Sequence, residues 1–551
     1  MNGAQALLRT LADAGVTVCF TNPGTSEMHF VAALDAEPRM RAVLTLFEGV
    51  ATGAADGYAR MRGHPAATLL HLGCGLGNGL ANLHNARKAH TPVVNIVGDH
   101  ATHHAALDAP LQSDIATVAR NVSGWLHTCT DVHALGAMAA SAVAAACHPP
   151  GQVATLMLPA DVSWSEGAAP GVVPPPQPPA RVDDARLAAI AQALTRGEPA
   201  ALLLGGAALR AEPQLDAARC AAACGARLLA ETFPARIERG AGLPPLARLA
   251  YLAELAQVQL RGVRHLVLVG ARAPVSFFAY PGKPGSLVPP GCTVHTLADV
   301  GEDAADALAR LAARLGAAGS EPPRQPPRRP PRPRGRLSAA TLAKAVGHLL
   351  PQGAIVVDES QTSGTLLPHF TRGAPCHDVL TLTGGAIGQG LPNAVGAAIA
   401  CPDRPVLALV GDGAAMYTPQ ALWTMARERL HVVTVILNNR AYAILQLELR
   451  RVGAVGGGER ARAQFDLGQP PLDFVQLAHG MGVPAQRVST AEAFADALER
   501  ALATPGPHLI EAIVPSTVRG VKKWLLPHVL GLLPHLPDGL ARGVQRAVAP
   551  P

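Results

Sequence analysis

Two short polar motifs, each directly after an apolar segment, constrain this chain more than any other feature. Gly411-Asp412-Gly413 follows the apolar residues 406–410, and Asn438-Asn439 follows the apolar residues 432–437. Apolar runs of this length predict buried strands of a parallel sheet, and the carboxyl ends of such strands meet at one edge. We therefore expect Asp412 and Asn439 to lie side by side.

The residue types at this edge suit a divalent cation. Asp412 offers a carboxylate, Asn439 a side-chain carbonyl and Ala441 a backbone carbonyl, which are hard oxygen ligands of the kind Mg²⁺ shares with phosphate. The flanking glycines allow a diphosphate to approach the backbone closely. A lone Gly-Asp-Gly is more often an ordinary turn, but the paired asparagines favour a metal site. Between the motifs, Thr418-Pro419 predicts a helix N-cap with proline at the first helical position.

Two proline-rich segments, residues 168–181 and 321–336, divide the chain and are typical of semi-rigid spacers. In each block between them, short apolar runs alternate with amphipathic stretches, which predicts parallel sheets covered by helices on both faces. The expected units are residues 1–167, 182–320 and 337–515, followed by a tail, residues 516–551. The fold class is therefore α/β with three parallel-sheet domains.

Composition excludes several classes of protein. A hydrophobic content of 49% with 16% charged residues is typical of large buried cores, not of disorder. The net charge of +6 comes partly from arginines of the second proline-rich segment, where aromatic residues are absent, so we expect a solvated linker and no nucleic-acid partner. Nine cysteines without a CxxC pair suit a reducing cytoplasm. No apolar run is long enough to span a membrane, and residues 1–15 predict an amphipathic helix, not a signal peptide.

Two further segments stand out. Glu48 follows the strand-like residues 41–46 and opens a helix rich in small residues, where the helix dipole stabilises a carboxylate. Residues 383–392 are glycine-rich and precede the Gly-Asp-Gly strand. Read alone, the first is a helix-cap carboxylate and the second a strand–helix turn.

Taken together, these motifs resemble a known family. Gly-Asp-Gly with the paired asparagines, the string E-x-x-A-x-x-x-A-x-G-Y-A-R from Glu48 to Arg60, and the glycine-rich segment are similar to signatures of thiamine-diphosphate-dependent enzymes. The resemblance is to the branch containing acetolactate synthase, benzoylformate decarboxylase, pyruvate decarboxylase and benzaldehyde lyase, and it spans about residues 1–515. It implies three doubly wound domains, pyrimidine-binding, central and diphosphate-binding, with thiamine diphosphate and Mg²⁺ as cofactors.

The resemblance also implies roles for single residues. Glu48 would bond N1′ of the aminopyrimidine of a cofactor held by a neighbouring subunit, so a homodimer or homotetramer is expected. The Gly385 carbonyl would accept from the 4′-amino group, and Ile387 would be the wedge that bends the cofactor. Asp412, Asn439 and the Ala441 carbonyl would hold Mg²⁺. The remaining residues expected at the cofactor are Pro23, Gly24, Asn78, Glu359, Gly411, Gly413, Ala414 and Tyr442.

On the substrate side, His71 falls where benzoylformate decarboxylase has a histidine, and an imidazole there would donate or accept a proton. Gln112 lies near the position of a substrate-side glutamine of acetolactate synthase and benzaldehyde lyase. The central stretch 273–280 lacks the second histidine of benzoylformate decarboxylase, so an identical aryl 2-oxo acid is not expected. Phe277-Phe278 in this stretch either shapes a pocket or packs in a core.

The function implied is 2-oxo acid decarboxylation through a carbanion/enamine intermediate, trapped by a proton or by a second carbonyl as in acetolactate synthase. A benzoylformate-decarboxylase-like enzyme and a catalytically silent cofactor-binding subunit are the alternatives. No nucleotide fingerprint marks the central block, and no GxGxxG opens the chain, which argues against FAD, CoA and nicotinamide cofactors. The amphipathic residues 521–533 predict a tail that packs on the protein, closes the site or touches a membrane surface, and we favour packing.

Overall fold

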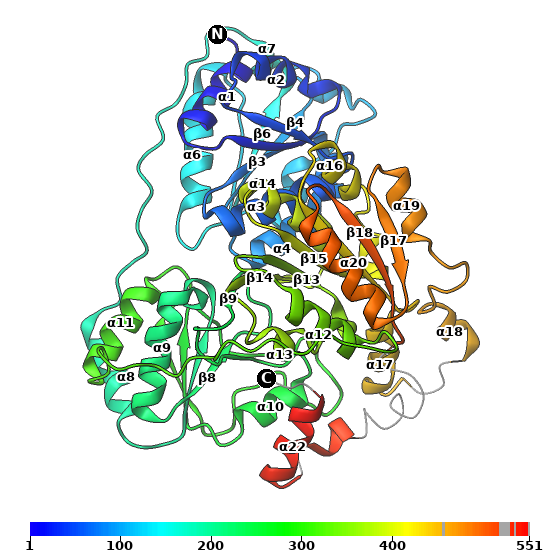
Figure 1. The fold of residues 1–551 in the computed structure, drawn as a ribbon. Coiled ribbons are helices and arrows are strands. Elements are labelled where there is room, and N and C mark those ends of the chain that lie inside the picture. The colour runs from blue at the N-terminus through cyan, green and yellow to red at the C-terminus, as the bar shows by residue number, and fades with distance from the viewer. Residues whose placement is uncertain (455–457, 517–528, 534–535, 549–551) are drawn as a thin grey trace.

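The computed structural model describes residues 1–454, 458–516, 529–533 and 536–548. Three lobes follow one another along the chain, and each is built on a sheet of mainly parallel strands (Figure 1). The α/β fold predicted from the alternation of apolar runs and amphipathic stretches is confirmed.

The N-terminal lobe holds a six-stranded parallel sheet in the order β2-β1-β3-β4-β6-β5. Its strands are β1 (Val18–Asn22), β2 (Arg41–Leu44), β3 (Ala66–Leu70), β4 (Val93–Asp99), β5 (Trp125–Thr128) and β6 (Val153–Pro159). Its α-helices are α1 (Gly3–Asp13), α2 (Met28–Ala33), α3 (Glu48–Arg62), α4 (Leu72–Lys88), α5 (Ile115–Arg120), α6 (Leu135–Cys147) and α7 (Ala160–Trp164). Asn2 and Gln5 form a capping box that starts α1. The predicted N-terminal amphipathic helix is therefore present.

The central lobe holds a five-stranded sheet in the order β10-β8-β7-β11-β12. The first proline-rich segment reaches it as a long extended run along the left of Figure 1. The strands are β7 (Ala200–Leu204), β8 (Arg227–Ala230), β10 (Ala247–Arg248), β11 (His265–Val269) and β12 (Thr293–Ala298). The α-helices are α8 (Asp184–Leu194), α9 (Ala211–Cys224), α10 (Ala253–Leu260) and α11 (Ala304–Arg314).

The C-terminal lobe holds a seven-stranded sheet in the order β17-β18-β16-β15-β13-β14-β9. Its strands are β13 (Ile355–Glu359), β14 (His377–Thr381), β15 (Val406–Gly411), β16 (Val432–Asn438), β17 (Ala485–Val488), β18 (His508–Ile513) and, from the central segment, β9 (Ile237–Arg239). Its α-helices are α12 (Ala339–Leu349), α13 (Leu367–Thr371), α14 (Gly390–Ala400), α15 (Asp412–Ala415), α16 (Ala421–Arg427), α17 (Ala443–Arg451), α18 (Glu459–Ala463), α19 (Phe474–Gly480) and α20 (Ala491–Ala503).

Strand β9 departs from the all-parallel expectation. It pairs antiparallel with β14, at the edge of a sheet that belongs to a different lobe. Arg236, just before β9, donates from Nε to Asp378 on β14 at 2.5 Å. The central segment thus completes the C-terminal sheet.

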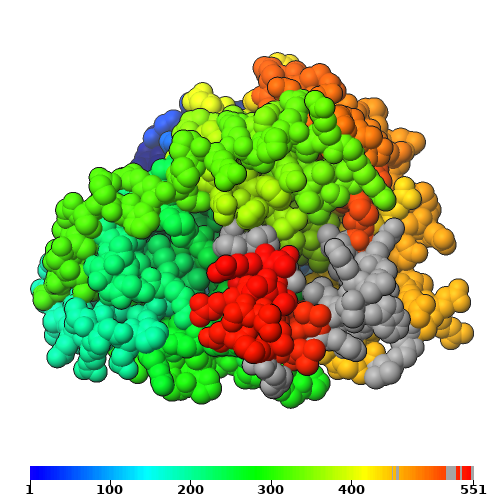
Figure 2. Space-filling view, turned by 60° about the horizontal axis from the view of Figure 1, so that its bottom comes forward, coloured from blue at the N-terminus to red at the C-terminus, as the bar shows by residue number. Residues whose placement is uncertain are grey.

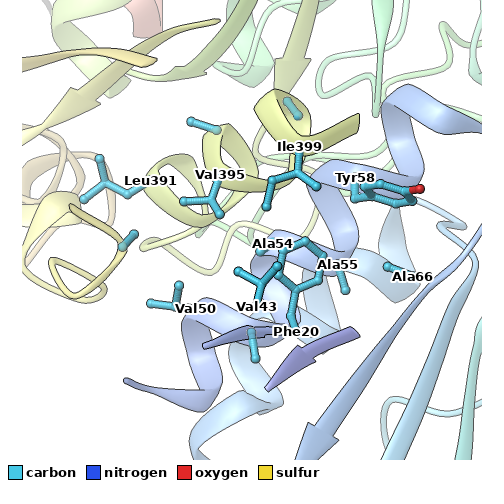
Figure 3. Close-up of a cluster of buried hydrophobic side chains, with 14 of the residues drawn as sticks. Phe20, Val43, Val50, Ala54, Ala55, Tyr58, Ala66, Leu391, Val395 and Ile399 are labelled. Atoms are coloured by element: carbon cyan, nitrogen blue, oxygen red, sulfur yellow. The ribbon is translucent and has the colours of Figure 1, made fainter. Parts of the chain in front are cut away.

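The N-terminal and C-terminal lobes share one core, because helices α3 and α14 pack directly on each other (Figure 3). Val50, Ala54 and Tyr58 of α3 lie in the same buried cluster as Leu391 and Val395 of α14. Both helices begin at glycine-rich or acidic motifs singled out in the sequence, so this packing brings those motifs toward each other.

The predicted helix N-cap at Thr418 is wrong. Helix α16 begins at Ala421, and Thr418 lies in the turn before it. The Thr418 hydroxyl instead donates to the Gly388 carbonyl at 2.9 Å. A tertiary partner has taken the hydroxyl that local sequence assigned to the helix.

The described part of the tail packs on the central lobe. Leu530 and Leu533 join Leu255 and Val258 of α10 in one apolar cluster, together with residues of α22 (Asp538–Val548). Figure 2 shows the C-terminal helix, in red, at the surface against the central lobe. Packing is thus observed for these residues, while residues 521–528 of the predicted amphipathic stretch lie outside the described residues. Among the helices that the structure describes, none is long and apolar enough to cross a membrane.

Candidate active site

The ends of β15 and β16 bring the two diagnostic motifs together. The strands pair in parallel, with Gly411 opposite Leu437, so Asp412 and Asn439 follow at the same edge. Asp412 accepts a hydrogen bond from the Arg440 backbone N–H at 2.6 Å. Asn439 Oδ1 accepts from the Ala441 N–H at 2.9 Å. The side-by-side placement expected from the strand ends is the one observed.

The turn after β16 is held by buried polar groups. Asn438 Nδ2 donates to Glu511 at 2.7 Å, and Glu511 is itself 1% exposed. Arg440 has a φ of +59°, a left-handed conformation that a non-glycine residue adopts only when its surroundings impose it. Tyr442 packs closely on Gly413, because a Cβ on that glycine would come 2.2 Å from the Tyr442 ring. The backbone at Gly413 is therefore approachable only because it carries no side chain.

The electrostatics of this edge fit a divalent cation. Asp412 is 3% exposed, and burial raises its pKa to about 6. A buried carboxylate without a counter-charge is costly, and a cation beside it removes that cost. Within the described residues no group of three or more His, Cys, Asp or Glu is arranged to hold a metal. The donor set here is instead one carboxylate with amide and backbone carbonyl oxygens, which suits Mg²⁺ completed by phosphate oxygens and water.

The glycine-rich segment that precedes α14 is held by Glu359. This buried carboxylate accepts backbone N–H bonds from Gly388 at 2.8 Å, Gln389 at 3.2 Å and Gly390 at 2.7 Å. Burial nevertheless raises the pKa of Glu359 to about 7. The sequence predicted Glu359 at the diphosphate end; both of its oxygens are bonded to the start of α14.

Gly385 and Ile387 lie in the same segment. Gly385 has a φ of +76°, in the region that favours glycine. Ile387 is partly buried and packs against the core shared by α3 and α14. The segment thus presents a fixed backbone with one apolar side chain at the start of a buried helix.

Glu48 is the first residue of α3 and is 6% exposed. Asn78 Nδ2 on α4 donates to its Oε2 at 3.0 Å. Oε1 lies 3.0 Å from where a Cβ of Gly75 would stand. The predicted residues Glu48 and Asn78 are therefore in direct contact, and the absence of a side chain at Gly75 leaves room for the carboxylate.

His71 lies at the end of β3, beside the loop that contains Pro23 and Gly24. Its Nδ1 lies 2.8 Å from Glu27 Oε2, and that carboxylate also accepts from the Ser26 hydroxyl at 2.5 Å and from the Gly24 N–H at 2.7 Å. Because a carboxylate only accepts hydrogen bonds, Nδ1 carries a proton and Nε2 is free to exchange one. Gly24 makes the contact possible, since a Cβ there would meet the His71 ring at 2.2 Å.

Asn82 joins the two halves of the site. Its Nδ2 lies 2.7 Å from the Gly49 carbonyl and 3.3 Å from the Gly388 carbonyl. The residue after Glu48 and the glycine-rich segment therefore meet at one side chain. Sequence reasoning missed both Asn82 and Glu27. The spacing of Asn78 and Asn82, one helical turn apart on α4, was a signal for the first.

Gln112 precedes Ser113, whose side chain reaches the start of α4. Its Oε1 is buried and has no hydrogen-bond partner among the described residues, and neither has the neighbouring Ser113 Oγ. The Ser113 hydroxyl lies 2.0 Å from where a Cβ of Gly73 would stand, two residues after His71. Buried polar groups without partners are costly, so these two atoms are suited to a polar ligand.

Family models match both outer lobes of this chain, and two curated proteins match nearly its whole length. The family model for the N-terminal TPP-binding domain of thiamine pyrophosphate enzymes matches residues 1–135, and the C-terminal TPP-binding domain model matches residues 361–512. A Mycobacterium tuberculosis protein named as acetolactate synthase large subunit IlvX is 60% identical over 94% of this chain and 100% of its own length. The benzoylformate decarboxylase of Pseudomonas aeruginosa is 31% identical over 90% of this chain and 96% of its own.

Solved structures show the same three-lobed architecture. A thiamine-diphosphate-dependent 4-hydroxybenzoylformate decarboxylase from Rhodococcus jostii superposes with a TM-score of 0.81 at 25% identity, covering 94% of this chain and 99% of that one. A benzoylformate decarboxylase from Polynucleobacter necessarius superposes with a TM-score of 0.79 at 24% identity and is similar in fold.

Proposed function

This chain belongs to the thiamine pyrophosphate enzyme family, and from that premise we propose that it is a Mg²⁺-dependent 2-oxo acid decarboxylase/carboligase similar to acetolactate synthase. The observation that carries the proposal is the buried Asp412, bonded to the turn that contains Asn439. The non-oxidative decarboxylase of the benzoylformate type is the second candidate, favoured by the histidine at position 71 and by the relatives of that name.

The cofactor is assigned to residues from both outer lobes. Asp412, Asn439 and the Ala441 carbonyl would hold Mg²⁺, and the diphosphate would lie against Gly411, Gly413, Ala414 and Tyr442. Gly385 and Ile387 would fix the bend between the cofactor rings, with Glu359 holding that segment in place. Bound thiamine diphosphate supplies an electron sink for cleavage of the bond next to a carbonyl. The corresponding domains are residues 1–167 for the pyrimidine, 182–320 as the central domain and 337–515 for the diphosphate.

The side chains of the N-terminal lobe are proposed to carry out proton transfer. Glu48, oriented by Asn78, would share a proton with N1′ of the aminopyrimidine, with Pro23 and Gly24 bordering that ring. His71, oriented through Nδ1 by Glu27, would give or take a proton at Nε2 near the substrate. Gln112 would donate to or accept from the substrate's polar end.

The site is proposed to be shared between subunits of a homodimer or homotetramer. Large apolar side chains beside the site residues are exposed in the single chain, which supports a covering partner. They are Leu46, Met416, Tyr417 and Leu445. A cytoplasmic location is in keeping with nine cysteines that are all free thiols.

Turnover of 2-oxo acids tests the function. Purified protein with thiamine diphosphate and Mg²⁺ is given pyruvate, branched 2-oxo acids and benzoylformate, and CO₂ release and products are followed. A carboligase yields a 2-hydroxy ketone or an acetohydroxy acid, and a simple decarboxylase yields an aldehyde. Cofactor binding without CO₂ release from any substrate would instead identify a catalytically silent subunit.

The Glu48→Gln variant tests the proposed role of Glu48 in the same assay. Replacing the carboxylate removes the proton partner of N1′ but keeps the shape and the bond from Asn78, so we expect kcat to fall about 10²- to 10⁴-fold. Binding of thiamine diphosphate, measured by calorimetry, should stay within about threefold. Glu212→Gln on the surface serves as the control. Unchanged turnover in Glu48→Gln would overturn the assigned mechanism.

A further inference from the structure

A hairpin of the central lobe reaches the glycine-rich segment. Residues 274–287, here called the aromatic hairpin, close on themselves through a bridge between Val275 and Ser286 and a 2.8 Å bond from the Ser276 N–H to the Gly285 carbonyl. Phe277 at its start packs on Gly385, because a Cβ on that glycine would lie 2.7 Å from the Phe277 ring. The central lobe therefore supplies one wall beside the backbone assigned to the cofactor's amino group.

The aromatic hairpin is fixed by a buried ion-pair network. Lys283 pairs with Glu254 of α10, and Glu254 also accepts from Arg451 at 2.8 Å. Arg451 donates to the Tyr280 hydroxyl at 3.3 Å and stacks on its ring, with 4.6 Å between the guanidinium carbon and the ring centroid. The side chains of Arg451 and Glu254 are 2% and 3% exposed. Because Arg451 ends α17, which begins just after Tyr442, the hairpin is anchored to the element that leaves the metal-binding turn.

The ring of Phe277 packs against three other aromatic rings but is itself partly exposed. Its ring lies 5.2 Å from Tyr251, 6.0 Å from Phe233 and 4.8 Å from Phe278, centroid to centroid. It remains 43% exposed. A rigidly supported, half-exposed ring next to catalytic backbone is the surface that an apolar group of a ligand buries most favourably.

We propose that Phe277 is a specificity-determining residue, and that the substrate is a 2-oxo acid whose side chain is apolar and larger than a methyl group, branched or aromatic. The contact surface of Phe277 thus revises the expectation, drawn from the missing histidine in residues 273–280, that an aryl 2-oxo acid is not the substrate. The inference rests on the proposed function, because it concerns the substrate of the same site. Phe277 carries no titratable group, so its contribution is contact with the substrate side chain and not proton transfer.

A substrate series tests the size preference. For the holoenzyme with Mg²⁺ we expect kcat/KM to rise from pyruvate to 4-methyl-2-oxopentanoate and benzoylformate by about tenfold or more, the range that apolar pockets produce. Phe277→Ala should cut this ratio about tenfold and leave pyruvate within about threefold. Equal loss for all substrates, or an unchanged ratio, would overturn the proposal.

A control variant and a binding measurement separate contact from folding. Val275→Ala removes another apolar side chain of the aromatic hairpin, which is 69% exposed, and should leave the ratio unchanged. Calorimetry with the 2-hydroxy acids mandelate and lactate reports binding without turnover; tighter binding of mandelate should vanish in Phe277→Ala. If that variant is unstable, Phe277→Leu should weaken mandelate selectively. Absence of CO₂ release from every 2-oxo acid in the wild type would refute the proposed function, whereas turnover with no preference over pyruvate would refute only this inference.

Discussion

Four acidic side chains are buried in the candidate site, and their partners differ in kind. Glu27 accepts from a hydroxyl, a backbone N–H and His71, whereas Glu48 accepts from the amide of Asn78. Glu359 accepts from three backbone N–H groups, and Asp412 accepts from the Arg440 N–H in the turn after β16. Burial raises the pKa of the last two, to about 7 and about 6. The same carboxylate group thus meets four different surroundings, and these suit it to the different roles proposed above.

The raised pKa of Glu359 predicts a pH-dependent stability of the cofactor-free protein. The folded protein keeps the Glu359 proton up to about pH 7, while the unfolded chain releases it near 4.5. Between these values the folded state binds more protons, so the free energy of unfolding falls as pH rises, by at most about 1.4 kcal/mol per pH unit. Denaturant unfolding at a series of pH values measures this slope.

Glu359→Gln should lower stability at every pH, because the amide is a poorer partner for three N–H donors, and should flatten the slope. Glu321→Gln, whose side chain is 87% exposed, is the control and should keep the wild-type slope. A slope that survives in Glu359→Gln would assign the effect to another group.

Helices α3 and α14 cross so closely that glycine is required at their contact. A Cβ on Gly396 would stand 1.9 Å from the Ala54 carbonyl oxygen, and one on Gly57 would stand 2.3 Å from the Asn393 carbonyl oxygen. Both obstacles are backbone atoms, which side-chain rotation cannot move. Since Glu48 opens α3 and the glycine-rich segment opens α14, this crossing sets the distance between these two segments within one chain.

Gly396→Ala should therefore destabilise the protein by about 1–3 kcal/mol, the usual cost of overpacking. Thermal unfolding followed by circular dichroism gives the change. Gly480, at the end of α19, has no atom near its Cβ position, and Gly480→Ala should change stability by about 0.5 kcal/mol or less. Equal stability of the two variants would show that the helices separate at little cost.

Local apolar runs were sufficient to predict the strands that lead into the cofactor motifs. The run 406–410 needs one more residue to match β15, and the run 432–437 needs one more to match β16. Strand β9 was not predicted, because Ile-Glu-Arg is too short and too polar to stand out and its pairing with β14 depends on a distant segment. The prediction of a helix N-cap at Thr418 was wrong for the same reason, because the hydrogen-bond partner of its hydroxyl, the Gly388 carbonyl, comes from a distant part of the sequence.

The candidate site was predictable where each residue directly follows a strand or begins a helix. Asp412, Asn439 and Glu48 are of this kind, because the end of an element fixes the position of the next side chain. The contact of Glu27 with His71 and that of Phe277 with Gly385 join separate elements, and no local pattern encodes them. Their roles, like those of the other site residues, stay predictions.

The three lobes are locked together by arginines that cross between them. Arg60 of α3 donates to the Thr381 carbonyl at 2.8 Å and to the Ala235 carbonyl at 3.2 Å, so one guanidinium reaches all three lobes. Arg451 ties the aromatic hairpin to the C-terminal lobe. The lobes that supply the candidate site residues are therefore held in fixed positions relative to one another within the chain.

Whether the site is completed within a chain or between chains is decided by mixed dimers. Glu48→Gln and Asp412→Ala should each be inactive alone. If Glu48 serves the partner's cofactor, a purified heterodimer of the two variants regains one intact site, about half the wild-type activity.

The reciprocal control is a heterodimer of one wild-type subunit and one subunit with the double substitution Glu48→Gln/Asp412→Ala. Shared sites leave this heterodimer without activity, because each site then combines one intact and one altered residue. Sites built within a chain would reverse both results: the first heterodimer would be silent and the second about half active.

Strand β9 has a consequence for biosynthesis. Residues 237–239 leave the ribosome long before their partner strand, residues 377–379, has been translated. Until then the backbone groups of β9 that face β14 lack their ladder partners, and nascent chains with such open edges are prone to aggregate. The middle of the polypeptide therefore cannot finish folding in the order in which it is made; it waits for the last third of translation to close its edge.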